Sequence, residues 1–344
     1  MRVAMYYSNT DIRIENSPQP VIAKNEVLLK IEASGICGSD VMEWYRKDKV
    51  PLVLGHEVTG VLCQVGRLVK KFKVGDRVIV THHVPCGHCD YCHRGHETVC
   101  ETLRKTNFDP GGFSEFLRVP SINVQKGMFR LPRVVSFEEG TFVEPLGCVL
   151  RGQRLSAMKK GRRVLVVGSG LSGLLHIKLA KYLGAASIIA TDVDDFRLSM
   201  SKKFGATAAI KATDDIPATV RQVNRGKLAD LVVICTSSQP AIASALRSVD
   251  RGGSVLIFSA AQKDATFPVT TNELFWRSEV KIASSYAASP QDLKDALNLI
   301  AKRKVTVRDM ITHRLRLDEI QKGFDLVVRP HNSIKVVIEP QRLT

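Results

Sequence analysis

The sequence predicts an α/β protein in which a doubly wound parallel sheet is joined to a second, mostly antiparallel β domain. After residue 162, short apolar strands alternate with helical stretches, which is typical of a parallel sheet with helices on both faces. Before residue 150, short apolar segments are separated by Gly, Pro and Asp, which is typical of antiparallel strands. The chain has 344 residues, 44% of them apolar, and this length suits two domains of about 150 residues each.

The individual elements follow from this pattern. In the first part we expect strands at 27–31, 58–65 and 77–80. In the second part, the expected strands are 164–168, 187–192, 229–236, 254–259 and 280–285, and the expected helices are 174–184, 196–205 and 239–249. After Pro290, two amphipathic helices at 291–304 and 317–328 precede a closing strand at 334–340. We expect one domain made of residues 1–150 and 287–344, and another made of residues 151–286.

The charge of the chain is strongly positive but dispersed. A total of 50 basic and 34 acidic side chains gives a net charge of +16, which favours acidic partners such as nucleic acid, an anionic membrane or a phosphorylated metabolite. The basic residues are scattered, without the long runs or interleaved aromatic residues of a nucleic-acid platform. The N-terminus has no signal-peptide core, and no apolar run approaches the roughly 20 residues that span a bilayer. We therefore expect a cytoplasmic protein that binds neither nucleic acid nor a membrane.

The segment VLVVGSGLSGLLHIKLAKYLGA predicts a dinucleotide site. Gly168, Gly170 and Gly173 follow a strand and open a helix, with Leu171 and Ser172 between the second and third glycine. The first glycine permits a tight turn, the second lets the backbone approach a pyrophosphate, and the third lets the helix pack on the strand. The helix N-terminus adds N–H donors and positive partial charge. This segment therefore predicts a Rossmann domain that binds its cofactor at the loop.

Asp192 ends the strand that follows the glycine loop. An acid about 20 residues beyond such a loop accepts hydrogen bonds from the ribose hydroxyls and repels a 2′-phosphate, so NAD is expected in preference to NADP. In the alternative interpretation, Asp192 only caps the helix that begins near Asp194. Arg197 could weaken the preference by pairing with a phosphate, or it could belong to a surface ion pair.

Four cysteines within a short segment predict a structural metal site. Cys86, Cys89, Cys92 and Cys100 form C-x2-C-x2-C-x7-C, and without a secretion signal such clustering favours a metal over disulfides. Four thiolates match the closed tetrahedral coordination of a structural zinc, which leaves no position for a substrate. A nucleic-acid-binding zinc ribbon would present its cysteines as two separated pairs. The nearby histidines are expected to be exposed loop residues: His88, His93 and His96.

Two further motifs, GICGSD at 35–40 and GHEVTG at 55–60, complete a set that resembles a known family. Together with the cysteine segment and GSGLSG, they are similar to the zinc-containing medium-chain dehydrogenases, especially the sorbitol, threonine and sugar-alcohol branch. The resemblance covers nearly the whole chain, including VGDRV at 74–78, FVEPLGC at 142–148 and IKVVIEP at 334–340. It implies a GroES-like catalytic domain at 1–150 and 287–344 and an NAD-binding domain at 151–286.

Carried over residue by residue, the resemblance implies a catalytic zinc. Cys37 and His56 match two ligands of the family, and Glu57 and Glu144 match two acids of which one ligates directly or through water in the polyol branch. Zinc with three protein ligands and an open position can bind a hydroxyl, lower its pKa and stabilise the alkoxide that releases hydride. One thiolate and one carboxylate leave such a site near zero net charge. Two zinc ions per chain are therefore expected, one catalytic and one structural.

Three further cysteines lie outside the two predicted metal sites. Cys148 follows Glu144 by four residues and could supply a thiolate ligand, although the EPL sequence of the family favours the glutamates. Cys148 is therefore expected to pack as a small buried hydrophobic residue. The same interpretation applies to Cys63 and Cys235, which lie in apolar strand-like segments.

The route of the alcohol proton is less regular. Ser39 matches the family residue whose hydroxyl passes this proton outward, and Asp40 is expected to fix the tautomer of a ligand histidine. Many relatives have a histidine two positions after this aspartate, but this chain has Met42. His82 or His83, or water, would then have to complete the route.

The resemblance implies a hydride-transfer reaction between a secondary alcohol and NAD. Paired glutamates near the metal favour a polyol, sugar alcohol or cyclitol, with L-threonine and a phosphorylated polyol as alternatives. The site is expected in the cleft between the domains, with Tyr45, Phe113 and Tyr286 as candidate wall residues. A homodimer or homotetramer is expected because relatives associate through the cofactor domain. Two non-enzymatic alternatives are a catalytically dead relative and a nucleic-acid-binding regulator.

Overall fold

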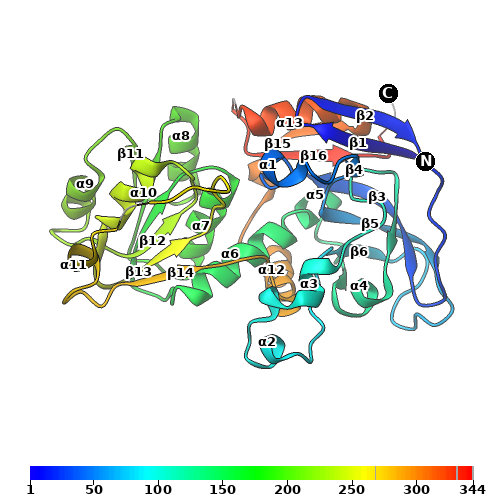
Figure 1. The fold of residues 1–344 in the computed structure, drawn as a ribbon, viewed down its shortest axis with the longest axis horizontal. Coiled ribbons are helices and arrows are strands. Elements are labelled where there is room, and N and C mark those ends of the chain that lie inside the picture. Colours follow the sequence, from blue (N-terminus) through cyan, green and yellow to red (C-terminus); the bar gives the residue numbers. More distant parts are fainter. Residues whose placement is uncertain (268, 331, 343–344) are drawn as a thin grey trace. The chain divides into compact units, whose positions relative to one another are not determined.

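The computed structural model describes residues 1–267, 269–330 and 332–342, and the chain forms two compact units (Figure 1). The first unit contains Met1–Gly147 and the C-terminal segment from Ala287, and the second contains Cys148–Tyr286. The first is built on mostly antiparallel strands and the second on a parallel sheet, which confirms the predicted fold class. Among the helices of the described residues, none is both long and apolar enough to cross a membrane.

The second unit contains a six-stranded sheet in which every neighbouring pair is parallel. Its spatial order is β11(Ala208–Lys211), β10(Ser187–Asp192), β9(Arg163–Val167), β12(Ala229–Ile234), β13(Val249–Ile257) and β14(Lys281–Ser284). The strand order therefore reverses between β9 and β12. Ligands of doubly wound sheets bind outside the carboxyl ends of the strands at such a point.

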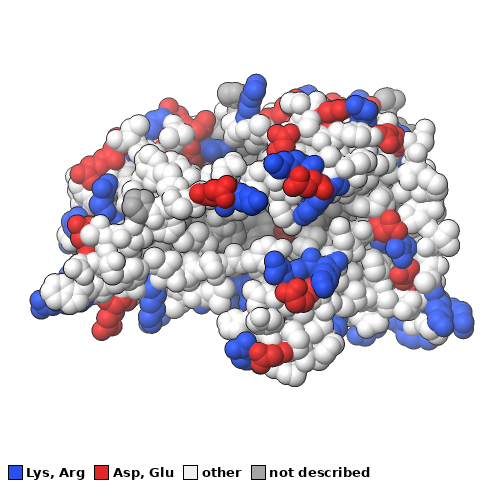
Figure 2. Space-filling model, viewed as in Figure 1, with Lys and Arg blue, Asp and Glu red and all other residues white. Residues whose placement is uncertain are grey.

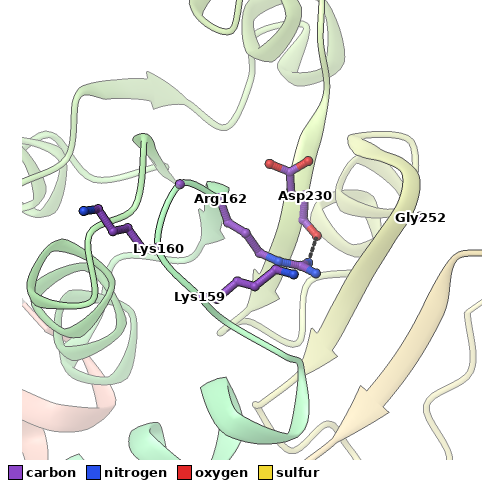
Figure 3. Close-up of a pocket in the computed structure, with 6 residues that line it drawn as sticks. Lys159, Lys160, Arg162, Asp230 and Gly252 are labelled. Carbon is purple, nitrogen blue, oxygen red and sulfur yellow. Dashed lines mark hydrogen bonds between the residues drawn. The ribbon is translucent and has the colours of Figure 1, made fainter.

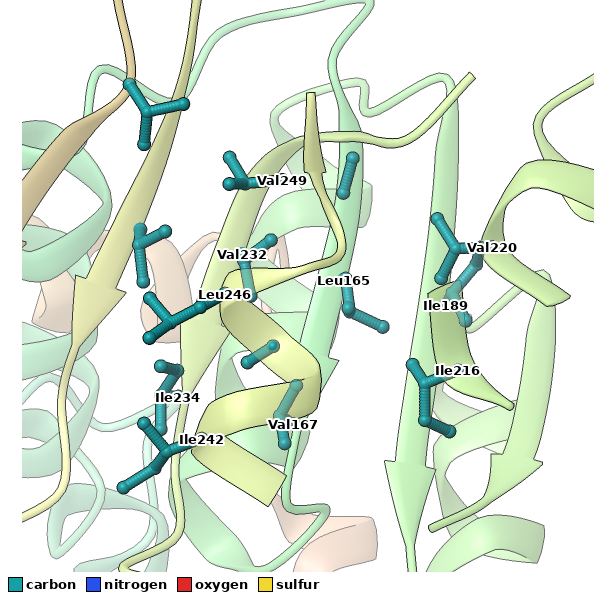
Figure 4. Close-up of a cluster of buried hydrophobic side chains, with 14 of the residues drawn as sticks. Leu165, Val167, Ile189, Ile216, Val220, Val232, Ile234, Ile242, Leu246 and Val249 are labelled. Carbon is teal, nitrogen blue, oxygen red and sulfur yellow. The ribbon is translucent and has the colours of Figure 1, made fainter. Parts of the chain in front are cut away.

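Helices connect the parallel strands, as the right-handed crossover of βαβ units requires. They are α7(Leu171–Tyr182), α8(Asp195–Phe204), α9(Ile216–Val223), α10(Gln239–Leu246) and α11(Thr271–Leu274). Figure 4 shows branched aliphatic side chains from β9, β12 and α10 in one buried cluster, among them Leu165, Val232 and Leu246. Because both faces of these strands are buried, their sequences are nearly continuous apolar runs.

One boundary in this unit differs from the sequence pattern. The helix predicted at 239–249 ends at Leu246, and β13 begins at Val249, five residues before the strand predicted at 254–259. Gly252 adopts a positive φ of 70° inside β13, and the register between β12 and β13 shifts there. The glycines that signal a turn in the sequence therefore lie within an irregular strand.

The first unit contains two sheets. The smaller has the order β2(Asp11–Asn16), β1(Arg2–Ser8), β4(Leu52–Val53). The larger has the order β15(Ile311–Arg316), β16(Lys335–Glu339), β3(Val27–Gly35), β5(Glu57–Val65), β6(Arg77–Val80), β8(Met128–Arg130), with β7(Phe116–Val119) also paired to β3. All of its pairs are antiparallel except β15 with β16.

Short helices connect and cover these sheets. The α-helices of the first unit are α1(Glu43–Arg46), α2(Asp90–His93), α3(Glu101–Lys105), α4(Ser121–Lys126), α5(Phe137–Gly140), α12(Pro290–Ala301) and α13(Ile320–Val328), with 3₁₀ turns η1(Glu97–Val99), η2(Arg308–Met310) and η3(Leu317–Glu319). α6(Val143–Leu155) begins in the first unit and continues into the second. The predicted helix at 317–328 therefore starts as a 3₁₀ turn before becoming α-helical at Ile320.

Candidate metal and dinucleotide sites

Antiparallel pairing of β3 with β5 brings Cys37 and His56 together. Gly35, the last residue of β3, pairs with Glu57, the first residue of β5, so Cys37 follows one strand where His56 precedes the other. The ligand atoms of Cys37, His56 and Glu57 all lie within 4.8 Å of one another. A thiolate, an imidazole and a carboxylate at this spacing match the three protein ligands of a catalytic zinc with a fourth position open.

Asp40 orients the imidazole of His56. One Asp40 oxygen accepts a hydrogen bond from the Cys37 backbone N–H at 3.0 Å, and the other lies 3.3 Å from Nδ1 of His56. Burial opposes charge on both side chains. Even so, the Asp40 carboxylate and the Cys37 sulfur raise the pKa of His56 well above its usual value, and His56 in turn lowers the pKa of Asp40. With Nδ1 engaged by Asp40, the other ring nitrogen is left for a metal.

A buried lysine that the sequence did not predict as a site residue also contacts this group. Lys335, the first residue of β16, places its Nζ against Oε2 of Glu57, and both side chains are 0% exposed. The other oxygen, Oε1 of Glu57, is buried without a hydrogen-bond partner among the described residues, as a metal ligand would be before the ion binds. The signal available in the sequence was a single lysine between the apolar Ile334 and the apolar residues 336–338.

The remaining predicted site residues are distributed around this group. Ser39 donates its hydroxyl to Sγ of Cys37 at 3.5 Å, so it lies directly beside the candidate metal ligands. Glu144 is the second residue of α6 and is half-buried, and it does not belong to the set of ligand atoms within 4.8 Å. Cys148 lies one turn later in the same helix and is also half-buried. Within the first unit, the structure therefore brings Glu57, and not Glu144, into the group with Cys37 and His56.

Two further histidines, His82 and His83, lie beside His56. The ring of His82 lies 4.8 Å from the ring of His56 and 3.6 Å from the ring of His83. Burial lowers the pKa of His82 well below its usual value and lowers that of His83 to about 4, so both are neutral at pH 7.

Of the candidate wall residues, Tyr45 and Tyr286 are exposed, but Phe113 is not a wall residue. It is 1% exposed and packs edge-on against Phe324 in the core.

The four-cysteine segment folds into a compact cluster around η1 and α2. All four Sγ atoms of Cys86, Cys89, Cys92 and Cys100 lie within 4.8 Å of one another. The distances from Cys92 Sγ are 3.5 Å to Cys89 and 3.9 Å to Cys86, close to the roughly 3.8 Å between sulfurs of a tetrahedral zinc thiolate. Burial alone would raise the pKa of Cys100, but backbone N–H donors lower it to about 6, which favours the thiolate. The donor set fits a closed, structural zinc site.

The glycine loop has the geometry that a pyrophosphate requires. Gly168 follows β9 with a positive φ of 91°, and Gly170 caps the N-terminus of α7, which begins with Leu171 and Ser172. A Cβ atom at Gly173 would lie 1.9 Å from the carbonyl oxygen of Gly168, so only glycine allows the helix to pack this closely on the strand. The exposed N–H groups of the first turn of α7 remain available to an anion.

Asp192 is tied to this loop from the end of β10. Its carboxylate accepts a hydrogen bond from the Ser169 backbone N–H at 2.7 Å and from the Asp194 N–H at 3.0 Å. The guanidinium of Arg197 lies 3.8 Å from Asp192 Oδ2. Asp194, and not Asp192, caps α8, because its side chain accepts from the Arg197 N–H. The helix-cap interpretation of Asp192 is therefore wrong.

The surface charges are dispersed. Figure 2 shows Lys and Arg side chains mostly interspersed with Asp and Glu side chains on the face in view. Ion pairs join basic and acidic side chains elsewhere in the described residues as well, for example Arg118 with Glu26 and Asp109, and Arg316 with Asp318. Such a distribution differs from the continuous basic stripe of a nucleic-acid interface.

A separate depression in the second unit is lined by basic side chains (Figure 3). Arg162 donates to the backbone oxygen of Asp230 at 3.0 Å, and the Asp230 carboxylate pairs with Arg163. These residues lie at the amino ends of β9 and β12, opposite to the glycine loop. The depression is therefore not part of the dinucleotide site.

Comparison with known proteins finds a matching family model for a segment of each unit. Residues 23–133 match the Alcohol dehydrogenase GroES-like domain family, and residues 173–302 match the Zinc-binding dehydrogenase family. The chain is 31% identical to the protein named Probable D-xylulose reductase A of Aspergillus fumigatus, over 95% of this chain and 93% of the relative. It is 30% identical to the L-threonine 3-dehydrogenase of Cronobacter sakazakii, over 93% of this chain and 94% of the relative.

Solved structures agree with this result. A zinc-binding dehydrogenase from Sinorhizobium meliloti 1021, bound to NADP, superposes with a TM-score of 0.87 at 27% identity, covering 98% of this chain and 99% of the other.

Proposed function

The chain belongs to the zinc-binding alcohol dehydrogenases and is an oxidoreductase, and from this premise we propose that Cys37, His56 and Glu57 hold the zinc of a polyol dehydrogenase. The observation that carries the proposal is the 4.8 Å grouping of their three ligand atoms, which come from the end of β3 and the start of β5. The reaction transfers hydride between a secondary alcohol and a nicotinamide dinucleotide. A second zinc is proposed for the four cysteines.

Each residue around the metal site has its own proposed role. When bound, zinc supplies a Lewis acid that polarises the substrate oxygen. Asp40 holds the His56 ring in one orientation, and Ser39, with its hydroxyl 3.5 Å from Cys37 Sγ, is placed to accept and pass on the alcohol proton. His82 is proposed as the next member of this route, because its neutral ring lies 4.8 Å from that of His56. Glu144 is proposed as a ligand only through water, since it lies outside the ligand group.

NAD is proposed as the cofactor in preference to NADP. The loop residues Gly168, Gly170, Leu171, Ser172 and Gly173 would bind the pyrophosphate, and Asp192 would bind the ribose hydroxyls. Each oxygen of this carboxylate accepts one backbone hydrogen bond, which leaves a second lone pair on each oxygen for the ribose hydroxyls. Arg197 lies close enough to Asp192 to offset part of its charge. The NADP bound to the S. meliloti relative makes this preference a point to test.

A polyol, sugar alcohol or cyclitol is the proposed substrate. This follows the names of the relatives, one acting on D-xylulose, and the polar groups around Glu57. L-Threonine is the second candidate, because a relative at 30% identity is a threonine dehydrogenase. A phosphorylated polyol is the third, since the net charge of +16 would favour it.

A homo-oligomer formed through the second unit is also proposed. β14 is an edge strand whose backbone can pair with another chain, and apolar side chains near it are exposed: Phe275 at 39%, Trp276 at 68% and Ile282 at 37%. Light scattering after size-exclusion chromatography would measure the mass. A monomer at micromolar concentration would contradict this part of the proposal.

The activity is tested by adding NAD, or NADP in parallel, to the zinc-loaded protein with a panel of polyols, phosphorylated polyols and L-threonine. Formation of the reduced cofactor is followed by absorbance, and the Cys37→Ser variant serves as the control for trace contaminating enzymes. We expect turnover of a polyol with NAD that the variant lacks. No turnover across the panel, with two zinc ions bound per chain, would favour the non-enzymatic alternatives.

A further inference from the structure

The buried lysine beside the candidate metal ligands is the feature of the first unit that the proposed reaction does not use. Lys335 Nζ contacts Oε2 of Glu57 and lies 3.3 Å from the backbone oxygen of Ile36. Lys335 and Glu57 form a fully buried charged pair, since both side chains are 0% exposed. A buried ammonium is costly unless it is paired, so Glu57 is its necessary partner.

The backbone is shaped around this pair. β16 pairs with β3 so that Val337 lies opposite Gly35, and β3 pairs with β5 so that Gly35 lies opposite Glu57. A Cβ atom at Gly35 would lie 2.6 Å from Nζ of Lys335 and would also overlap the Glu57 carboxylate. Glycine at position 35 therefore leaves the space through which an ammonium from one neighbouring strand reaches a carboxylate on the other.

The two oxygens of Glu57 have different surroundings. Oε2 is occupied by Lys335, whereas Oε1 is buried without a hydrogen-bond partner among the residues that the structure describes. The carboxylate also belongs to the group of ligand atoms that lie within 4.8 Å of one another. One oxygen is thus held by a cation while the other is free to take a metal.

Resting on the proposed function, we propose that Lys335 is a positioning residue that shares the Glu57 carboxylate with the zinc ion and limits how tightly the ion is held. The Cys37 thiolate and the Glu57 carboxylate together neutralise a divalent ion, and Lys335 adds one positive charge that directly contacts a ligand, whereas the balancing Asp40 carboxylate lies behind His56. A cation this close repels zinc in a medium of low dielectric constant, so it keeps the site electrophilic at the expense of metal affinity.

A charge series of four proteins tests the proposal: the wild type, K335M, E57Q and E57Q/K335M. Methionine and glutamine keep the approximate volumes, and only the local charge changes. Zinc affinity is measured by competition with a chromophoric chelator, without cofactor or substrate, and zinc in the four-cysteine site is the internal control. K335R, which keeps the charge, is the conservative control.

The expected order of affinity follows the local charge. K335M should bind zinc at this site about 10- to 100-fold more tightly than the wild type, the size found for residues that contact metal ligands. E57Q should bind most weakly, and E57Q/K335M should bind more tightly than E57Q by about tenfold. K335R should match the wild type within about threefold. If K335M does not fold, the comparison of E57Q with E57Q/K335M decides the question, with the folding of E57Q, which leaves the Lys335 ammonium without its carboxylate, checked by circular dichroism.

Two results would overturn the proposal. Equal affinities of the wild type and K335M, or of E57Q and E57Q/K335M, would show that the lysine charge does not act on the ion. Weaker binding by K335M would show that Lys335 supports the ligand geometry without opposing the ion. In contrast, failure of the wild type to bind any zinc beyond the four-cysteine site would contradict the proposed function itself.

Discussion

The two units each bury a histidine, and the two side chains behave in opposite ways. His56, in the first unit, faces the Asp40 carboxylate and the Cys37 sulfur, which raise its pKa well above the usual value despite burial. For His176, in α7 of the second unit, no charged group among the described residues shifts the pKa, and burial alone lowers it to about 3. Its Nδ1 lies 3.2 Å from Nε2 of Gln153, and its ring packs edge-on against Phe258. Burial therefore does not distinguish a metal ligand from a core residue, but the charges around it do.

The same contrast extends to the units as a whole. Around His56 the first unit buries Asp40, Glu57 and Lys335, which are charged groups that need one another or an ion. The second unit fills its sheet core with aliphatic side chains and presents its candidate ligand site through backbone N–H groups of the glycine loop. We infer that the first unit depends on metal ions for local order and reactivity, whereas the second is held by apolar packing.

The largest effect is expected from removing the metal of the four-cysteine segment. Structural zinc contributes an apparent binding free energy of about 10–16 kcal/mol in small domains, and residues 86–100 offer only short helical turns to replace it. In Cys100→Ser, we expect the loss of one zinc per chain and rapid cleavage within this segment in limited proteolysis. Residues 148–286 should stay resistant. Unchanged resistance of the segment in the variant would contradict a structural role for the metal.

The second-largest effect is expected on kcat/KM, which should distinguish His56 from His176. His56→Gln should lower kcat/KM by about 1,000-fold, because a Lewis acid contributes several kcal/mol and 1.36 kcal/mol is a factor of ten. His176→Leu should change kcat/KM by less than about threefold, because His176 is a buried residue of α7 and is not one of the candidate metal ligands. Steady-state kinetics at saturating NAD and metal analysis of both variants check this. A similar loss of kcat/KM in both variants would mean that both substitutions act by disturbing the fold, and that the two histidines do not differ in catalytic role.

Acid stability tests the second histidine directly. Because His176 has a pKa of about 3 in the folded state and about 6.5 when unfolded, the unfolded chain binds the extra proton between these values. Its contribution to stability is therefore complete above about pH 6.5 and is lost progressively as the pH falls toward 3. Between pH 7 and 5 the loss should be about 2 kcal/mol.

His176→Leu should lack this pH-dependent loss, measured by urea unfolding at each pH. Gln153 keeps an acceptor in the variant, because it also donates to the backbone oxygen of residue 176 at 2.9 Å. The exposed His88→Leu variant is the control and should behave like the wild type. Equal pH dependence in wild type and His176→Leu would mean that the buried ring is protonated in the folded protein.

The sequence predicted local features better than those assembled by strand pairing. The cysteine segment and the glycine loop are contiguous, so spacing alone carries their geometry. The Cys37 and His56 pair was available only from the family resemblance, since nothing local shows that β3 and β5 are antiparallel neighbours. Lys335 was missed because it reaches the site from a strand nearly 300 residues away in the chain, through space that Gly35 leaves open. Phe113 was misplaced because an aromatic residue beside glycines resembles a loop residue until its packing on Phe324 is known.

The smallest effect concerns Asp192, whose carboxylate is held against the glycine loop of the second unit. Asp192→Gly should raise kcat/KM with NADP relative to NAD by about tenfold, or about 1.4 kcal/mol, by removing a negative charge that opposes a 2′-phosphate. However, the variant also removes the acceptor for the Ser169 and Asp194 N–H groups, which shape the loop.

Asp192→Asn separates these two roles, because its amide oxygen can keep one backbone hydrogen bond while the charge is lost. If repulsion sets the preference, Asp192→Asn should relax it as much as Asp192→Gly does, with a smaller loss of NAD affinity. If Asn keeps the full preference, the carboxylate would act by shaping the loop. The second unit would then select its cofactor through backbone geometry alone, and its contrast with the charge-dependent site of the first unit would be sharper.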